Sequence, residues 1–184
     1  ALPISTLALA ILFVKLGLVG IKSATNSVLF ATIIFMLGGI LGTAHHWYFS
    51  GTPTSTIAFG AMFSALEVVP LILIGFEAYG NYRHSRSDSW LAKYKWPILF
   101  FVAVSFWNLI GAGVFGFLIN TPISLYFVQG LNLTANHGHT ALFGVYGMLG
   151  IGLMLFCLRG LAARSQWDDN LLKTAFWALN VGLG

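Results

Sequence analysis

The segment Ala135-Asn136-His137-Gly138-His139-Thr140 stands at the head of an apolar run that continues to Leu158. Successive residues of a helix advance by about 100°, so His137 and His139 point about 200° apart and cannot easily share one metal ion. Neutral imidazole nitrogens are common metal ligands, and each ring can reach a different flat cofactor. The segment therefore predicts a helix that carries a cofactor on each of two opposite sides.

A second pair of histidines, His45 and His46, lies near the end of another apolar run. Adjacent helical residues about 100° apart can converge on one ion when a third ligand comes from elsewhere. This pair is typical of part of a metal site.

The composition is that of a membrane protein. Apolar residues make up 58% of the 184 positions and charged residues 8%, and the mean hydropathy is +0.85. Such values lie outside the range of soluble domains. The basic residues that give the net charge of +4 lie in short gaps between apolar runs. Membrane topology explains them there, and we expect no nucleic-acid partner.

Six apolar segments predict an all-α, polytopic transmembrane helix bundle in a single region. They cover about residues 7–21, 27–48, 56–79, 97–119, 134–158 and 170–184. The last segment is shorter than the roughly 20 residues that a full span needs. We expect the chain to be a fragment of a larger core of twelve or more helices, with the bilayer and the rest of the polypeptide as its partners.

Charge alternates between the gaps and predicts the orientation. The first, third and fifth gaps carry Lys and Arg, and the second and fourth carry none. The uncharged gaps are therefore placed outside the cytoplasm of a bacterial inner membrane. Both histidine pairs adjoin these outer gaps, which puts all four rings roughly 3 to 8 Å inside the outer ends at about 1.5 Å per residue. We expect the four imidazoles at one depth.

Glu67 lies near the middle of its predicted span, where a carboxylate must be paired, protonated or in contact with water. We interpret it as a proton carrier or a carboxylate near the metal, with a structural hydrogen bond as the alternative. Asn108 and Thr43 are predicted to form interhelical hydrogen bonds.

The stretch from Gly111 to Gly116 formally matches the GxGxxG pattern of dinucleotide-binding sites. That pattern requires a preceding strand, whereas this copy lies inside an apolar span. Close helix packing through small residues is the better interpretation.

Three motifs, in this order along the chain, together resemble the large subunit of bacterial nitric oxide reductases, in the haem-copper oxidase superfamily. They are Gly42-Thr43-Ala44-His45-His46, Ser64-Ala65-Leu66-Glu67-Val68-Val69-Pro70 and His137-Gly138-His139-Thr140-Ala141-Leu142-Phe143-Gly144. The resemblance spans nearly the whole chain. The basic third gap, with the segment from Trp107 to Gly113, is more similar to the quinol-dependent branch, in which the reductase is a single polypeptide.

The resemblance implies a role for each site residue. His45 and His46 would ligate a non-haem iron, and Glu67 would lie near that iron and serve proton supply. His137 would be the axial ligand of a high-spin haem b that faces the iron, and His139 one axial ligand of a low-spin haem b. The third iron histidine, its neighbouring carboxylate and the second low-spin ligand would lie upstream of this chain.

The implied activity is the reduction of two NO molecules to N2O and water in a respiratory chain, as in denitrification. Quinol is the expected electron donor, with cytochrome c as the alternative, and we expect the chain by itself to be inactive. The rival hypotheses are a terminal oxidase, with copper in place of iron and oxygen as substrate, and a non-catalytic haem protein that relays electrons or senses gas. The remaining hypothesis is a membrane domain with a purely structural role.

Overall fold

The computed structural model describes residues 2–15, 17, 19–47, 50–66, 69, 72, 76, 79–80, 83, 92–128, 130–161 and 167–184. Every regular element in these residues is a helix. In chain order they are α1 (Leu2–Lys15), α2 (Ile21–Leu41), the 3-10 helix η1 (Gly42–Trp47), α3 (Thr54–Ala65), α6 (Lys95–Trp107), the π-helix η2 (Asn108–Val114), α7 (Phe115–Asn120), α8 (Pro122–Val128), α9 (Asn132–His139), the π-helix η3 (Thr140–Gly147), α10 (Met148–Leu161) and α11 (Asp169–Leu183).

Three continuous helical rods are long and apolar enough to cross a membrane. They run over Ile21–Ala44, Lys95–Asn120 and Asn132–Leu161, with 24, 26 and 30 residues and mean hydropathies of 2.0 to 2.1. A span needs only about 20 residues, because a helix rises about 1.5 Å per residue across a core about 30 Å thick. The predicted all-α, multi-pass membrane architecture is confirmed.

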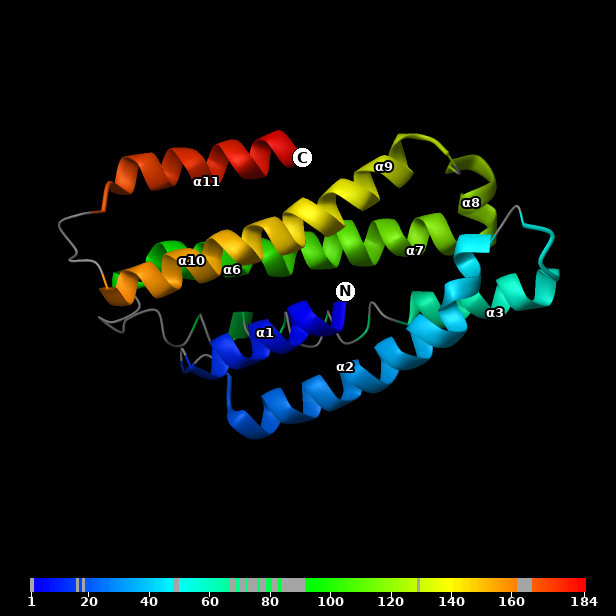
Figure 1. The fold of residues 1–184 in the computed structure, drawn as a ribbon, viewed down its shortest axis with the longest axis horizontal. Coiled ribbons are helices and arrows are strands. Elements are labelled where there is room, and N and C mark those ends of the chain that lie inside the picture. Colours follow the sequence, from blue (N-terminus) through cyan, green and yellow to red (C-terminus); the bar gives the residue numbers. More distant parts are fainter. Residues whose placement is uncertain are drawn as a thin grey trace.

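The rods α6–η2–α7 and α9–η3–α10 pack side by side at the centre of the molecule (Figure 1). Their contact is filled by side chains that are 0–1% exposed, namely Phe100, Phe101, Val104, Val145 and Met148. A Cβ built on Gly152 would lie 2.6 Å from Cε1 of Phe101, so α10 approaches α6 as closely as a glycine allows. This pair of rods is the rigid core of the described chain.

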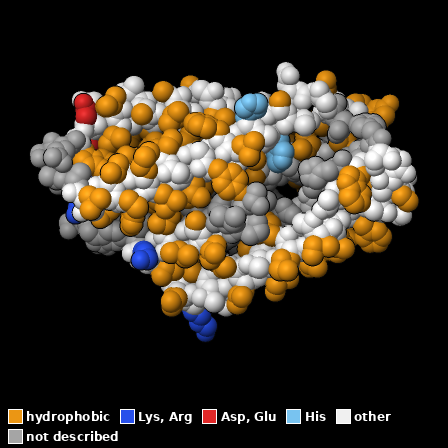
Figure 2. Space-filling model, viewed as in Figure 1, with side chains coloured by type: hydrophobic (Ala, Val, Ile, Leu, Met, Phe, Trp, Pro, Cys, Tyr) orange, Lys and Arg blue, Asp and Glu red, His pale blue; other side chains and the backbone are white. Residues whose placement is uncertain are grey.

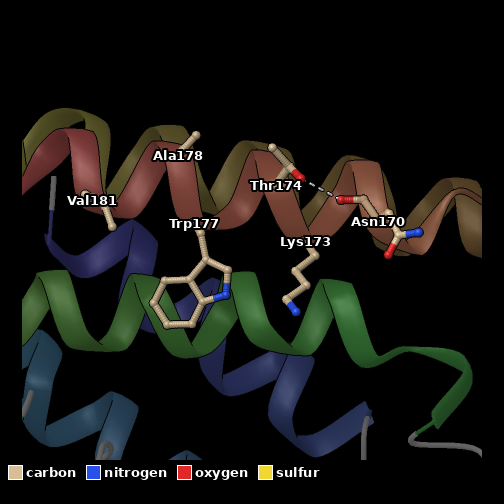
Figure 3. A pocket seen from close by; sticks show the side chains of 6 residues that line it. All are labelled: Asn170, Lys173, Thr174, Trp177, Ala178 and Val181. Carbon is tan, nitrogen blue, oxygen red and sulfur yellow. Dashed lines mark hydrogen bonds between the residues drawn. The ribbon is translucent and has the colours of Figure 1, made fainter.

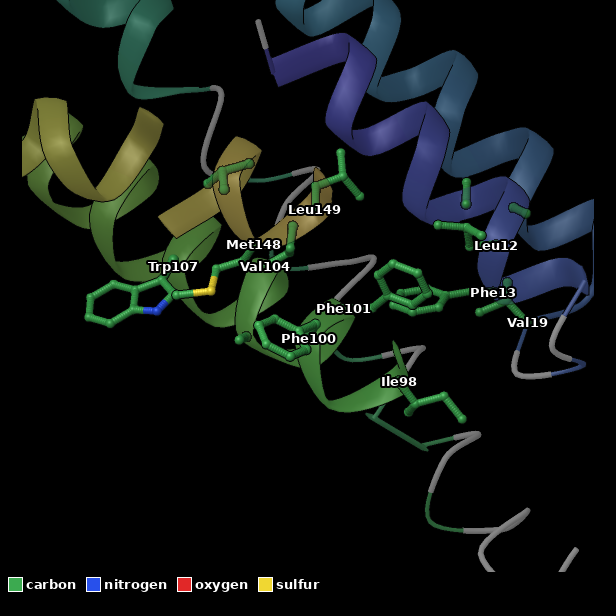
Figure 4. Close-up of a cluster of buried hydrophobic side chains, with 14 residues drawn as sticks. Leu12, Phe13, Val19, Ile98, Phe100, Phe101, Val104, Trp107, Met148 and Leu149 are labelled. Carbon is green, nitrogen blue, oxygen red and sulfur yellow. The ribbon is translucent and has the colours of Figure 1, made fainter. Parts of the chain in front are cut away.

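Helices from both ends of the chain extend this core. Phe13 of α1 belongs to the same buried cluster as Phe101 of α6 (Figure 4), and α2 packs against α1. Near the C-terminus, α11 contacts α6 and η3, and the indole Nε1–H of Trp107 donates to Oδ1 of Asn180 at 2.8 Å. The indole proton of Trp107 thereby gains a partner inside an apolar region.

Large apolar side chains remain exposed over much of the surface (Figure 2). On α2, Ile33 is 58% exposed and Ile40 is 72% exposed. One face of α11, from Asn170 to Val181, lines a shallow groove of about 580 Å³ in which Trp177 and Lys173 extend from the same edge (Figure 3). Such surfaces suit lipid or further membrane helices rather than water.

The helix ends differ from the sequence prediction in the first third of the chain. We predicted an apolar helix over 7–21 followed by a polar turn, whereas α1 ends at Lys15 and α2 already begins at Ile21. Gly17 adopts φ of +67°, a left-handed conformation that ends a helix. The polar residues form the first turn of α2, where the Thr25 hydroxyl donates to the Ile21 carbonyl at 2.8 Å.

The outer gap between the fourth and fifth predicted spans is also more ordered than a plain loop. It contains α8, which begins at Pro122. Proline is favoured at the first position of a helix because its missing N–H has no intrahelical partner there.

Candidate functional site

The two π-helices η2 and η3 pack against each other in the middle of the central rods. A Cβ built on Gly111 of η2 would overlap the side chain of Thr140, the first residue of η3. Only glycine fits at this close approach. The glycines of the GxGxxG stretch thus serve helix packing, as predicted, and the contact lies one residue from the His137–His139 pair.

His137 is fixed by the neighbouring rod. Its Nδ1–H donates to the carbonyl oxygen of Gly111 at 2.8 Å, and its side chain is half-buried. A carbonyl can only accept, so this hydrogen bond places the proton on Nδ1 and leaves the Nε2 lone pair available to a metal. At the end of the π-helix, the N–H of Phe115 donates to the carbonyl of Ile110. The carbonyl of the following residue, Gly111, accepts the hydrogen bond from His137.

The ring of His137 also lies against the backbone of α7. A Cβ built on Gly116 would stand 3.1 Å from its Cε1 atom. One turn along the helix, the Thr140 hydroxyl donates to the backbone carbonyls of Asn136, at 2.7 Å, and of His137, at 3.2 Å. The hydrogen bond to Gly111 and the close contact with Gly116 therefore set the position of this imidazole.

His139 is held by its own helix instead. Its Nδ1–H donates to the carbonyl of Ala135, one turn earlier, at 2.8 Å, and its side chain is exposed. The same tautomer follows, with Nε2 free. Histidine side chains are open to the face drawn in Figure 2. Each of the two histidines therefore offers one unprotonated ring nitrogen. The neighbouring rod holds the ring of His137, and its own helix holds the ring of His139.

The second histidine pair lies in η1, whose backbone is described while the side chains of His45 and His46 are not. The backbone of η1 is a 3-10 helix with about three residues per turn, so successive residues advance by about 120° rather than the 100° of the predicted α-helix. A Cβ on Gly42 would lie 3.4 Å from the backbone nitrogen of Ser64, so η1 packs closely on α3.

Contacts connect η1 with the helix that carries His137. Helix α3 packs against α7, which packs against α9, and Figure 1 places η1 and α9 at the same end of the molecule. Glu67 lies outside the described residues. Among the residues that are described, no three His, Cys, Asp or Glu side chains could hold a metal ion together. The iron ligands and the role of Glu67 stay predictions.

The two predicted interhelical hydrogen-bonders behave differently. The prediction for Thr43 is wrong, because its hydroxyl donates to the carbonyl of Gly39 in the preceding turn of its own helix. Asn108 is 3% exposed, and its Oδ1 has no hydrogen-bond partner in the described part of the chain. A side-chain hydrogen bond between α3 and α7 is made by Asn120, whose Nδ2 donates to Oγ of Ser64 at 3.0 Å.

The sequence matches the family of cytochrome c and quinol oxidase polypeptide I over residues 2–184. The chain belongs to this family. It is thereby a member of the haem-copper oxidase superfamily, whose proteins bind haem and a metal at a binuclear centre. The described residues fit a haem, since two imidazoles with anchored Nδ1 atoms and free Nε2 atoms are the donor set that haem iron uses.

The oxidase-family chain is also similar to a nitric oxide reductase polypeptide of Stutzerimonas stutzeri. The identity is 29% over 152 residues, which cover 80% of this chain and 31% of that protein. The chain thus spans about a third of the length of this relative.

Proposed function

We propose that this chain is the ligand-bearing part of a membrane nitric oxide reductase, which reduces two NO to N2O and water. The observation that supports haem binding most directly is the hydrogen bond from His137 Nδ1–H to the Gly111 carbonyl. The choice of NO as substrate is supported by the similarity to the Stutzerimonas stutzeri nitric oxide reductase and by the ordered motifs around His45, Glu67 and His137.

In this proposal His137 holds a high-spin haem b and His139 a low-spin haem b, while His45 and His46 hold a non-haem iron. When bound, these groups would supply iron that can bind NO and a path for the electrons that reduce it. The reaction consumes two NO, two electrons and two protons, and releases one N2O and one water.

The protein residues orient the ligands and supply protons. The Gly111 carbonyl fixes the plane and tautomer of His137 and raises the basicity of Nε2, as outer hydrogen bonds do for metal-bound histidines. The Ala135 carbonyl does the same for His139. We assign Glu67 to proton supply near the metal, because a carboxylate in a membrane span must be paired, protonated or in contact with water.

An oxygen reductase is the second candidate, and the family match itself favours it, because the family includes oxidases of cytochrome c and quinol. The two candidates differ in the second metal. A carboxylate beside imidazoles suits iron, whereas an all-imidazole site suits copper.

The test uses the complete natural protein that contains this chain, purified in detergent. We expect N2O from NO with reduced quinol, slower turnover with reduced cytochrome c, and one non-haem iron for two haems b. Copper in a one-to-one ratio with high-spin haem, together with oxygen consumption, would show an oxidase instead. Haem bands without turnover of either gas would show an electron relay or sensor. Residues 1–184 alone should make no N2O.

A further inference from the structure

Arg159, at the far end of the rod that carries the histidines, is buried and has no ion-pair partner among the described residues. It is 5% exposed, and its Nε–H donates to the carbonyl of Lys93 at 2.8 Å. Its guanidinium lies 4.7 Å from the ring centroid of Trp167. Within the described part of the chain, Nη1 has no hydrogen-bond partner. A buried guanidinium with an unpaired N–H is costly, which points to a ligand at this position.

A small polar cavity adjoins this guanidinium. It has a volume of about 90 Å³ and is lined by Lys93, Lys95, Arg159 and Asp169, with Ala92, Trp96 and Trp167. Water occupies about 30 Å³ per molecule, so the space equals about three waters, comparable with one phosphate group. Three cations face one carboxylate, and Oδ1 of Asp169 already accepts the indole N–H of Trp96 at 3.0 Å. The cavity therefore favours an anion.

The cavity lies where lipid headgroups meet helix ends. The start of α6, the end of α10 and the start of α11 gather at one end of the molecule, away from α9 (Figure 1). The Lys93 ammonium lies 5.7 Å from the ring of Tyr94, and that of Lys95 lies 5.1 Å from the ring of Trp96. Aromatic and basic residues combine in this way at the membrane–water boundary, here on the basic side predicted to be cytoplasmic.

We propose that this cavity binds the phosphate group of an anionic phospholipid from that leaflet. The planar guanidinium of Arg159 matches phosphate oxygens, and Lys93 and Lys95 add charge beside it. Basic pockets between membrane helices on the cytoplasmic side are suited to such headgroups. This site lies at the opposite end of the rods from the histidines and does not depend on the proposed reaction.

The experiment measures lipid binding to the delipidated complete protein by native mass spectrometry, a readout independent of NO turnover. The probes are phosphatidylglycerol, phosphatidylcholine and inorganic phosphate. The test variant Lys93→Gln/Lys95→Gln changes two exposed side chains, so folding should be preserved. Its matched control is Lys22→Gln, which removes one exposed charge at the start of α2 on the same predicted side.

We expect wild-type protein to bind phosphatidylglycerol more tightly than either other probe. Each lost cation should weaken this binding about fivefold, from about 1 kcal/mol per charge, so the double variant should lose about 25-fold. Arg159→Lys keeps the charge and should lose about fivefold through a missing hydrogen bond. Lys22→Gln should change the affinity by no more than about twofold, because Lys22 does not line the cavity and salt screens exposed charges that lie beyond the site.

Three results would overturn the assignment. An equal loss of affinity per removed charge in Lys22→Gln and in the double variant would mean general surface attraction. Equal affinity for phosphatidylcholine would mean that headgroup charge is not recognised. Inorganic phosphate that binds as tightly as the lipid would identify free phosphate as the occupant.

Discussion

The two histidines of α9 are the same residue type, two positions apart, yet different interactions hold their rings. His137 is half-buried, and its Nδ1–H binds a carbonyl of the neighbouring rod, at Gly111. His139 is exposed and binds the Ala135 carbonyl of its own helix. Tertiary packing therefore sets the position of the His137 ring, and local helix geometry sets the position of the His139 ring. Substitutions in the neighbouring rod should therefore shift the ring of His137 and leave the ring of His139 in place.

The largest effect is expected for Gly111→Val. The new side chain would overlap Thr140 and separate the two π-helices, which also withdraws the carbonyl that binds His137. Overpacking of this kind costs about 3 kcal/mol of unfolding free energy. Thermal unfolding in detergent should show a lower Tm, and the high-spin haem signal should be lost before the low-spin signal.

The matched control is Gly150→Ala in α10, where a Cβ would meet nothing within 4 Å. This change should be neutral, or stabilising by up to about 1 kcal/mol through helix propensity. Equal destabilisation by the two variants would contradict the role given to the Gly111–Thr140 contact.

Gly116→Ala should lower the unfolding free energy by an intermediate amount, and it tests the difference between His137 and His139 separately from Gly111. Its Cβ would stand 3.1 Å from Cε1 of His137, so the ring must shift by a few tenths of an ångström. We expect a loss of about 1 kcal/mol and a changed high-spin haem spectrum in the complete protein, with the low-spin spectrum unaltered. A shift of the low-spin spectrum alone would reverse our assignment of the two histidines.

Thr140→Val should have the smallest effect. It removes the hydroxyl that donates to the carbonyls of Asn136 and His137 but keeps the branched shape that packs on Gly111. One net hydrogen bond is worth about 1 kcal/mol or less. Urea unfolding of the purified protein measures this loss, and a loss above about 3 kcal/mol would mean that the hydroxyl has a further partner.

The sequence predicted the parts of this arrangement that follow from periodicity and composition. The apolar runs predicted an all-helical membrane chain, and the glycines around Gly111 predicted close helix packing. The 200° separation of His137 and His139 follows from helix geometry alone. The acceptor that holds His137 is the backbone carbonyl of Gly111, and a backbone carbonyl leaves no signal in the sequence.

Other features could not be predicted, because a charged residue at the end of an apolar run can be either exposed or buried. Arg159 looked like an ordinary charge that sets topology, and only the fold shows it buried among Lys93 and Trp167. Lys15 falls within the span predicted over residues 7–21, yet α1 ends there, because Gly17 takes a left-handed conformation. The roles of His45, His46 and Glu67 stay predictions that rest on the sequence motifs.

The central claim is that His137 and His139 ligate two different haems from one helix. Electron paramagnetic resonance and optical spectra of His137→Ala and His139→Ala, in the complete protein with quantified haem, test it most directly. We predict that His137→Ala loses the high-spin signal and regains it with added imidazole, while the low-spin signal remains, and that His139→Ala does the reverse. If both variants lose the same haem, or if neither loses any, the account is contradicted.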